Sequence, residues 1–162
     1  MNFWGRTRRN HALEHASIGL MLNRPLANAI HAGYSIPMGF FVLGDVPTDT
    51  VRKASQQALE RMQHGEGELA ISPFCGTNMV VASGLSTLGV LLALRFSGGG
   101  PLGWMRSFSN VMWALMLSRP LGRMVQRRYT TSADVKGMSI NTVSRHAMGK
   151  FVVHWVSTSF SL

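Results

Sequence analysis

The chain has 162 residues, of which 46% are hydrophobic and only 14% are charged. Soluble domains carry about 25% charged residues, so this composition argues against a small domain with a fully hydrated surface and favours a membrane or a large buried interface. The single cysteine, Cys75, excludes an intrachain disulfide. The N-terminal residues lack the apolar segment of a cleaved signal peptide, so none is expected.

The net charge of +9 is carried almost entirely by the second half of the chain. Residues 1–75 hold seven basic and six acidic side chains, whereas residues 76–162 hold nine basic side chains and one acidic side chain. A basic half of this kind is typical of a nucleic-acid-binding or a membrane-bound protein. The arginines flank apolar runs instead of covering one polar face, which favours a membrane surface. We therefore expect a lipid bilayer as a partner, and no nucleic acid.

Residues 1–77 are predicted to form an α-β-α-β domain. Apolar side chains recur every three or four positions over residues 6–22, which predicts a helix. The aromatic and β-branched run at 38–43 predicts a strand, and a second helix is expected over 48–64, ended by the sequence GEG. The stretch ELAISPFCG, residues 68–76, predicts a second strand that ends in a turn.

Twenty residues without a charge, CGTNMVVASGLSTLGVLLAL at 75–94, follow this domain. That length is enough to cross the hydrocarbon core of a bilayer, although a buried helix of a soluble protein is the alternative. The apolar segment within 104–122 is shorter, because Arg106 and Arg119 bound its uncharged part. It can cross a bilayer only if the side chains of these arginines extend to the headgroups. We predict a transmembrane helical hairpin over 78–128, followed by a C-terminal segment, 129–162, whose strand joins the sheet of the first domain.

The arginines that follow the second apolar segment predict the orientation of the hairpin. Arg119, Arg123, Arg127 and Arg128 come close together, and the positive-inside rule places such clusters in the cytoplasm. A hairpin returns the chain to the side from which it started. We therefore expect both the N-terminal domain and the C-terminus on the cytoplasmic side of a bacterial inner (cytoplasmic) membrane.

The sequence HALEH, residues 11–15, has the residue types of a metal site. Helix positions four residues apart lie on one face, so His11 and His15 can point two imidazoles at one ion. Glu14 borders the same face, and the order H-x-x-E-H is that of inverted zinc peptidases. A metal ion lowers the pKa of bound water, and a neighbouring carboxylate can accept the proton. The alternative is an ordinary solvated helix face.

Cys75 is the candidate third ligand. Inverted zinc peptidases take that ligand from a downstream glutamate, but this chain has no glutamate after Glu68. A thiolate is a strong ligand for zinc and for ferrous iron, and Cys75 comes at the end of the predicted strand. The alternative for Cys75 is an inert buried thiol. His31 is either a further candidate ligand or a surface histidine.

The order of these motifs resembles the S-ribosylhomocysteinase family, the autoinducer-2 synthases. In that family an HTLEH-like helix precedes an SPMG turn, a strand, a long helix and a strand that ends in CGT. Here the corresponding stretches after HALEH are SIPMG (35–39), FFVLGDVPTD (40–49), VRKASQQALERM (51–62) and ELAISPFCGT (68–77). The resemblance covers residues 10–77 and implies an α+β metalloenzyme-like domain. It also implies a divalent metal, zinc or ferrous iron, held by His11, His15 and Cys75 with a water as fourth ligand, and Glu14 as general acid/base.

Two features depart from that family. It has a catalytic cysteine just after its SPMG turn, where this chain has Phe40 and Phe41, and it is soluble, whereas this chain continues into an apolar hairpin. We therefore do not expect cleavage of S-ribosylhomocysteine. The dimers of that family imply a homodimer here. The whole chain also resembles a group of bacterial membrane proteins with an N-terminal HALEHA segment.

The sequence leaves three functions open. The first is a membrane-anchored metal-dependent hydrolase or lyase, in which the metal activates water or a carbonyl and Glu14 moves the proton. The second is a non-catalytic accessory subunit of a larger membrane complex, respiratory or photosynthetic. The third is a membrane-bound peptidase, against which the missing downstream glutamate counts.

Overall fold

The computed structural model describes residues 2–22, 30–149 and 151–161, except for the side chains of His31 and Met148. The prediction for His31 as a ligand therefore lies outside the described part of the chain. The chain divides into two compact units. Unit 1 comprises Met1–Ser72 and Arg127–Leu162, and unit 2 comprises Pro73–Gln126. Along the sequence, unit 2 is thus an insertion between two parts of unit 1.

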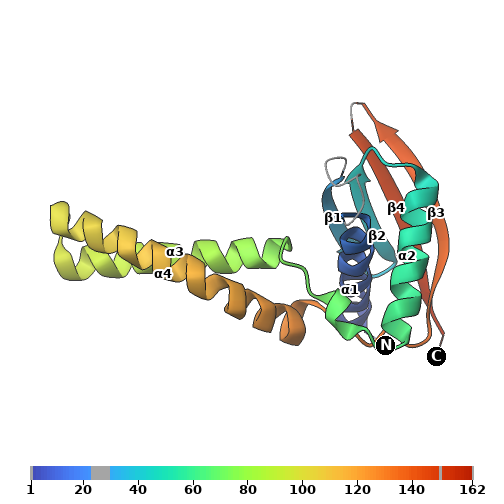
Figure 1. Ribbon diagram of the computed structural model, residues 1–162, viewed down its shortest axis with the longest axis horizontal. Coiled ribbons are helices and arrows are strands. Elements are labelled where there is room, and N and C mark those ends of the chain that lie inside the picture. Colours follow the sequence, from blue (N-terminus) through green and yellow to red (C-terminus); the bar gives the residue numbers. More distant parts are fainter. Residues whose placement is uncertain (1, 23–29, 150, 162) are drawn as a thin grey trace. The chain divides into compact units, whose positions relative to one another are not determined.

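Unit 1 is an α+β domain built on a four-stranded antiparallel sheet (Figure 1). The strands are β1 (Ile30–Ile36), β2 (Gly39–Gly44), β3 (Met138–Met148) and β4 (Phe151–Phe160). Their order in the sheet is β1-β2-β4-β3. The strands predicted at 38–43 and near the C-terminus are confirmed as β2 and β4, and β4 pairs with β2 inside the sheet.

Helices α1 (Phe3–Leu22) and α2 (Thr48–Gln63) cover one face of this sheet (Figure 1). On the covered face Phe40, Val42 and Val156 are fully buried. The helices contribute apolar side chains at three- and four-residue spacing, among them Leu13 and Ala16 from α1 and Val51, Ala54 and Ala58 from α2. This burial of apolar surface is the main stabilising term for the domain.

Neither α1 nor α2 covers the opposite face of the sheet, and a row of aromatic side chains crosses it. Tyr34 on β1 pairs with Phe41 on β2, which in turn pairs with Trp155 on β4. The ring centroids of Phe41 and Trp155 are 4.5 Å apart, and Tyr34 is 68% exposed. Phe41 and Trp155 are partly buried, so the row is a partly exposed apolar surface, of the kind that can contact a partner.

The strand predicted at 68–76 is wrong. Gly67–Ala70 form a short 3₁₀ helix, η2, and the chain then runs without regular structure to the next helix. The amide of Ile71 donates to the carbonyl of Glu68, so the backbone closes on itself instead of pairing with a strand. Pro73 supplies no N–H group for a ladder.

Unit 2 is a pair of helices, α3 (Gly76–Ser97) and α4 (Pro101–Val125), which pack side by side (Figure 1). The predicted segment 104–122 lies within α4. The buried positions of α4 are all small: Gly103, Ser107, Ala114, Ser118 and Gly122. On α3 the buried position is Ala93, and Gly89 lies so close to α4 that Asn110 donates a hydrogen bond of 3.0 Å to its carbonyl. Small residues allow the two backbones to approach closely.

The large apolar side chains of unit 2 point away from the contact between its helices. Leu88, Leu91, Phe108, Trp113 and Met116 are between 53% and 69% exposed. This arrangement is the reverse of a water-soluble helix pair, which buries its large apolar side chains. By length and composition, α3 is the one helix in the described residues that is long and apolar enough to cross a membrane.

His154 on β4 is fully buried, and neither of its ring nitrogens has a hydrogen-bond partner in the described residues. Burial lowers the pKa of His154, the charge of Arg145 lowers it further, and Asp45 opposes both effects. The folded protein therefore keeps this imidazole neutral at pH values where an unfolded chain, with a histidine pKa of about 6.5, has begun to protonate.

We expect the stability of unit 1 to fall as the pH drops below about 6.5, because the unfolded chain then binds a proton that folded His154 does not. The loss should level off once the pH is below the folded pKa. Replacing His154 with leucine should remove this part of the pH dependence of Tm, measured on the full chain in detergent. Exposed His146 on β3 provides the control, since His146→Leu should retain the dependence. Equal pH profiles for His154→Leu and the unaltered chain would contradict this assignment.

Candidate metal centre

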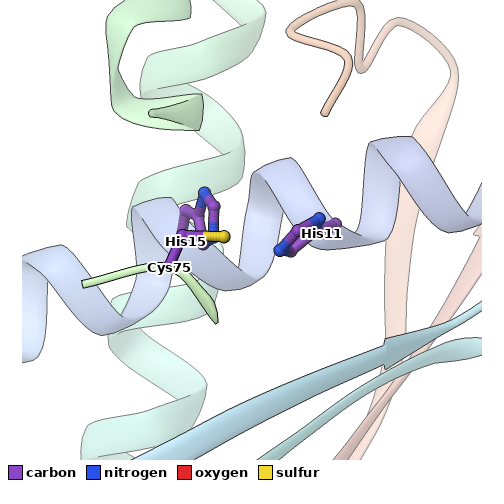
Figure 2. A group of neighbouring side chains, drawn as sticks. All are labelled: His11, His15 and Cys75. Atoms are coloured by element: carbon purple, nitrogen blue, oxygen red, sulfur yellow. The ribbon is translucent and has the colours of Figure 1, made fainter. Parts of the chain in front are cut away.

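Helix α1 presents His11 and His15 one turn apart on the same face (Figure 2). Their ring centroids are 4.3 Å apart and their planes are inclined by 60°. The intervening residues Ala12 and Leu13 are fully buried in the core of unit 1. The apolar side chains of α1 therefore hold the helix in unit 1. The rotation of the helix about its own axis then sets the direction in which both imidazoles point.

Two backbone carbonyls set the protonation pattern of the imidazoles. Nδ1 of His11 is 2.9 Å from the carbonyl oxygen of Thr130, and Nδ1 of His15 is 2.8 Å from that of Ala70. A carbonyl oxygen only accepts hydrogen bonds, so both Nδ1 atoms carry the proton. Each neutral ring then keeps its lone pair on Nε2. Histidines that bind metals are typically held in this way, with the second ring nitrogen donating to a carbonyl or carboxylate.

Cys75 brings its sulfur to the same place. One ligand atom from each of His11, His15 and Cys75 lies within 4.8 Å of the other two (Figure 2). Ligand atoms around one tetrahedral zinc are about 3.3–3.6 Å apart, so a small contraction would complete the geometry. Cys75 is also the N-cap of α3, where Sγ accepts a hydrogen bond of 3.4 Å from the amide of Thr77. A helix N-terminus favours a negatively charged atom at this position.

Glu14 is buried, at 5% exposure, and its carboxylate lies against β1. The hydroxyl of Ser35 on β1 donates a hydrogen bond to Oε2 of Glu14. Gly33 leaves the space that the carboxylate fills, because a Cβ built on Gly33 would be 2.2 Å from Oε1 of Glu14. The position of Glu14 therefore depends on two residues of one strand. Glu14 is not one of the three residues that form the candidate ligand group.

The donor set fits a divalent metal of intermediate softness. Two imidazoles and one thiolate are typical ligands for zinc and for ferrous iron. Three protein ligands leave one tetrahedral position for water or a substrate atom, as in catalytic zinc sites. The predicted residues His11, His15 and Cys75 thus come together, and their geometry suits an open metal site.

Four residues around the site were not predicted from the sequence. Thr130 and Ala70 act through backbone carbonyls, which no side-chain pattern reveals. Ser35 lies in the SIPMG stretch, but the sequence does not show that β1 lies beside α1. Only that arrangement lets the Ser35 hydroxyl donate a hydrogen bond to Glu14. Gly33 lies in the same strand, and the close approach of Glu14 explains why a glycine occupies this position.

Comparison with known proteins identifies a family whose model this chain matches. The model of a domain of unknown function, DUF6391, matches residues 6–143. An uncharacterised protein of Picosynechococcus sp. (strain ATCC 27264 / PCC 7002 / PR-6) is 29% identical over 143 residues. That match covers 77% of this chain and 65% of the relative, so the chain corresponds to somewhat less than two thirds of the relative's length. No solved structure matches the chain.

Proposed function

The chain belongs to the DUF6391 family, and we propose that it is a membrane-anchored, metal-dependent hydrolase or lyase. The observation that carries this proposal is the approach of the ligand atoms of His11, His15 and Cys75 to within 4.8 Å of one another. The support is strengthened by the two carbonyls that accept hydrogen bonds from Nδ1 of both imidazoles, as the partners of metal-bound histidines do. A solvated helix face would not need a buried His15 and a half-buried His11 whose Nδ1 atoms both donate to backbone carbonyls.

The residues have separate roles in this proposal. His11, His15 and Cys75 would hold zinc or ferrous iron, which when bound polarises a carbonyl or lowers the pKa of a coordinated water. Glu14 accepts the proton and returns it to the leaving group. Ser35 holds the carboxylate of Glu14 through its hydrogen bond. The substrate contains a bond that such a centre can cleave, an ester, an amide or a bond next to a carbonyl.

The proposed anchor is the helix pair of unit 2. Its outward-facing large apolar side chains and its small buried residues suit a lipid environment. Residues 73–126 contain four arginines and no acidic residue. Arg119 and Arg123 lie at the end of α4, where the positive-inside rule favours the cytoplasmic face of a bacterial inner membrane. Unit 1 would then lie in the cytoplasm.

The proposed function can be tested with the purified full chain and the variant Glu14→Gln. Elemental mass spectrometry should find about one zinc or iron per chain in both proteins after anaerobic purification in detergent. A panel of esters, amides and compounds with a cleavable bond next to a carbonyl should reveal turnover by the unaltered chain that a chelator abolishes. Glu14→Gln should keep the metal and lose this turnover by roughly 10²–10⁴-fold. Absence of metal from the unaltered chain would overturn the proposal.

The partly exposed aromatic row on the sheet favours a second candidate, an accessory subunit of a larger membrane complex. Tyr34, Phe41 and Trp155 form an apolar surface on unit 1, outside the proposed membrane anchor. For such a subunit the metal site would stabilise the fold without turnover. A protein that retains its metal, shows no turnover on any substrate and copurifies with a stoichiometric protein partner would favour this candidate over the enzyme.

A further inference from the structure

We propose that one edge of unit 1 binds the headgroups of anionic phospholipids. This aromatic–basic edge consists of Phe3, Trp4, Arg127, Arg128 and Tyr129. The proposal rests on the proposed function in one respect, namely that the helix pair of unit 2 lies in a membrane. It adds a second contact with the bilayer, made by the α+β domain itself, and a preference for one class of lipid.

Hydrogen bonds from Arg8 join the two parts of the edge. The Arg8 guanidinium donates to the carbonyl of Arg128 at 3.0 Å and to that of Thr131 at 2.7 Å. The amide of Ser132 donates to the carbonyl of Arg8 at 3.1 Å. Trp4 lies one helical turn before Arg8 on α1. The first turn of α1 and the segment 127–129 are therefore neighbours, although they are more than 120 residues apart in the chain.

Three aromatic side chains on this edge are turned to the outside of unit 1. Phe3 is 73% exposed, Trp4 is 55% exposed and Tyr129 is 60% exposed. Exposed aromatic rings are costly in water, but tryptophan and tyrosine are enriched at the membrane–water interface, where one end is apolar and the other hydrated. Grouped with arginines, they match the composition of an interfacial contact.

The charge of the edge is complementary to anionic lipid. Arg128 is exposed, and Arg127 pairs with Glu68, which is also exposed. Two more exposed arginines, Arg119 and Arg123, precede them on α4. Between Glu68 and Asp134 the chain has no acidic residue. Basic side chains next to a membrane segment attract phosphatidylglycerol and similar lipids.

Chain continuity places this edge at the level of the headgroups. The chain leaves unit 1 after Ser72 and returns to it at Arg127, and Arg127 pairs with Glu68 at 2.7 Å. The two ends of the insertion are thus close together within unit 1. If the inserted helices lie in a bilayer, residues 127–129 follow directly from the membrane segment and cannot be far from its surface.

The fluorescence of Trp4 can test the proposal in the full chain. The other three tryptophans are replaced by phenylalanine, and the protein is placed in nanodiscs of phosphatidylcholine with or without phosphatidylglycerol. Lipids brominated near the headgroup should quench Trp4 strongly in the anionic nanodiscs and weakly in the neutral ones. Arg127→Gln/Arg128→Gln should weaken association of the edge with the anionic surface by roughly 30-fold, and the quenching should fall accordingly.

A matched control removes two charges from elsewhere on unit 1. Arg52 near the start of α2 donates to the carbonyl of Val143, and Arg145 pairs with Asp45. Arg52→Gln/Arg145→Gln should leave the quenching of Trp4 unchanged. Equal quenching in neutral and anionic nanodiscs, or an equal loss in both double variants, would overturn the proposal. A response of Trp4 to inorganic phosphate in neutral nanodiscs would also overturn it, because the ligand would then be free phosphate.

A second reporter separates this proposal from the proposed function. A chain that keeps only Trp113, on α4, should be quenched by lipids brominated deep in the acyl chains. If Trp113 is not quenched, the helix pair is not in the bilayer, and the membrane anchor and this proposal both fail. If Trp113 is quenched while Trp4 shows no preference for anionic lipid, the anchor stands and the anionic edge alone is overturned.

Discussion

Replacing Cys75 with serine is expected to lower the affinity of the protein for zinc by roughly 10²–10³-fold. The reason is that a complete set of zinc ligands contributes about 10–16 kcal/mol, so one thiolate of four ligands accounts for about a quarter of it. His15→Ala should have an effect of the same size, since it removes another ligand and leaves the Ala70 carbonyl without its donor. The affinity is measured by competition with a chromophoric chelator at neutral pH.

His64→Ala is the control for this series. His64 follows α2, is exposed, and bonds through Nδ1 to the carbonyl of Glu60 in its own helix. Its loss should leave the affinity for zinc unchanged. If Cys75→Ser binds zinc as tightly as the unaltered chain, the thiol is not a ligand. If His64→Ala loses as much affinity as His15→Ala, the measured binding is not that of the proposed centre.

Replacing Gly33 with alanine is expected to destabilise unit 1 by about 1–3 kcal/mol, the usual cost of overpacking a buried site. The added Cβ would lie 2.2 Å from Oε1 of Glu14 and 2.7 Å from Cδ1 of Ile18, so both side chains must move. Gly19 on α1 has no atom within 4 Å of such a Cβ, and Gly19→Ala should stabilise its helix by about 0.5–1 kcal/mol. Denaturant unfolding in detergent compares the two.

A double variant identifies the cause of the expected loss. With Glu14→Ala in place, the main obstacle to alanine at position 33 is gone, so Gly33→Ala should then cost less. If Gly33→Ala costs less stability in the Glu14→Ala background than in the unaltered chain, the clash with the Glu14 carboxylate is the cause of the loss. If Gly33→Ala were as harmless as Gly19→Ala, the carboxylate would have free room to move, and β1 would not fix the position of Glu14.

The candidate metal ligands were the most predictable part of the site, and the groups that orient them were the least. The spacing of His11 and His15 implies a shared helix face, because helical geometry alone brings positions four apart together. Cys75 depended on the chemistry of thiolates and on the resemblance to S-ribosylhomocysteinases. The carbonyls of Ala70 and Thr130 could not be predicted, since any residue type offers the same backbone group.

The fold was predictable where side-chain patterns were regular. The run at 38–43 became β2, and the helix over 6–22 lies within α1, which begins earlier, at Phe3. β1 was missed because its sequence, IHAGYSI, contains small and polar residues and forms one edge of the sheet. β3 was missed because an irregularity between Ile140 and Thr142 breaks the alternation of buried and exposed side chains.

The length of the second helix of unit 2 could not be predicted from the sequence. The positions of Arg106 and Arg119 predicted a short second apolar segment within 104–122, but α4 continues through both arginines and through Pro120 as one helix of 25 residues. Its small buried residues, spaced four or seven positions apart, hold it against α3, so tertiary packing outweighs local propensity. Only the pattern of small residues, and not mean hydropathy, marks this contact in the sequence.

The strand order β1-β2-β4-β3 has a consequence for the biosynthesis of the protein. β4, the last strand to leave the ribosome, fills the position between β2 and β3. Until it is made, β2 has an open edge and the aromatic row lacks Trp155. The Thr130 carbonyl that orients His11 is also translated only after the whole of unit 2. The apolar helices therefore emerge from the ribosome while the domain that carries His11 and His15 is still unfinished.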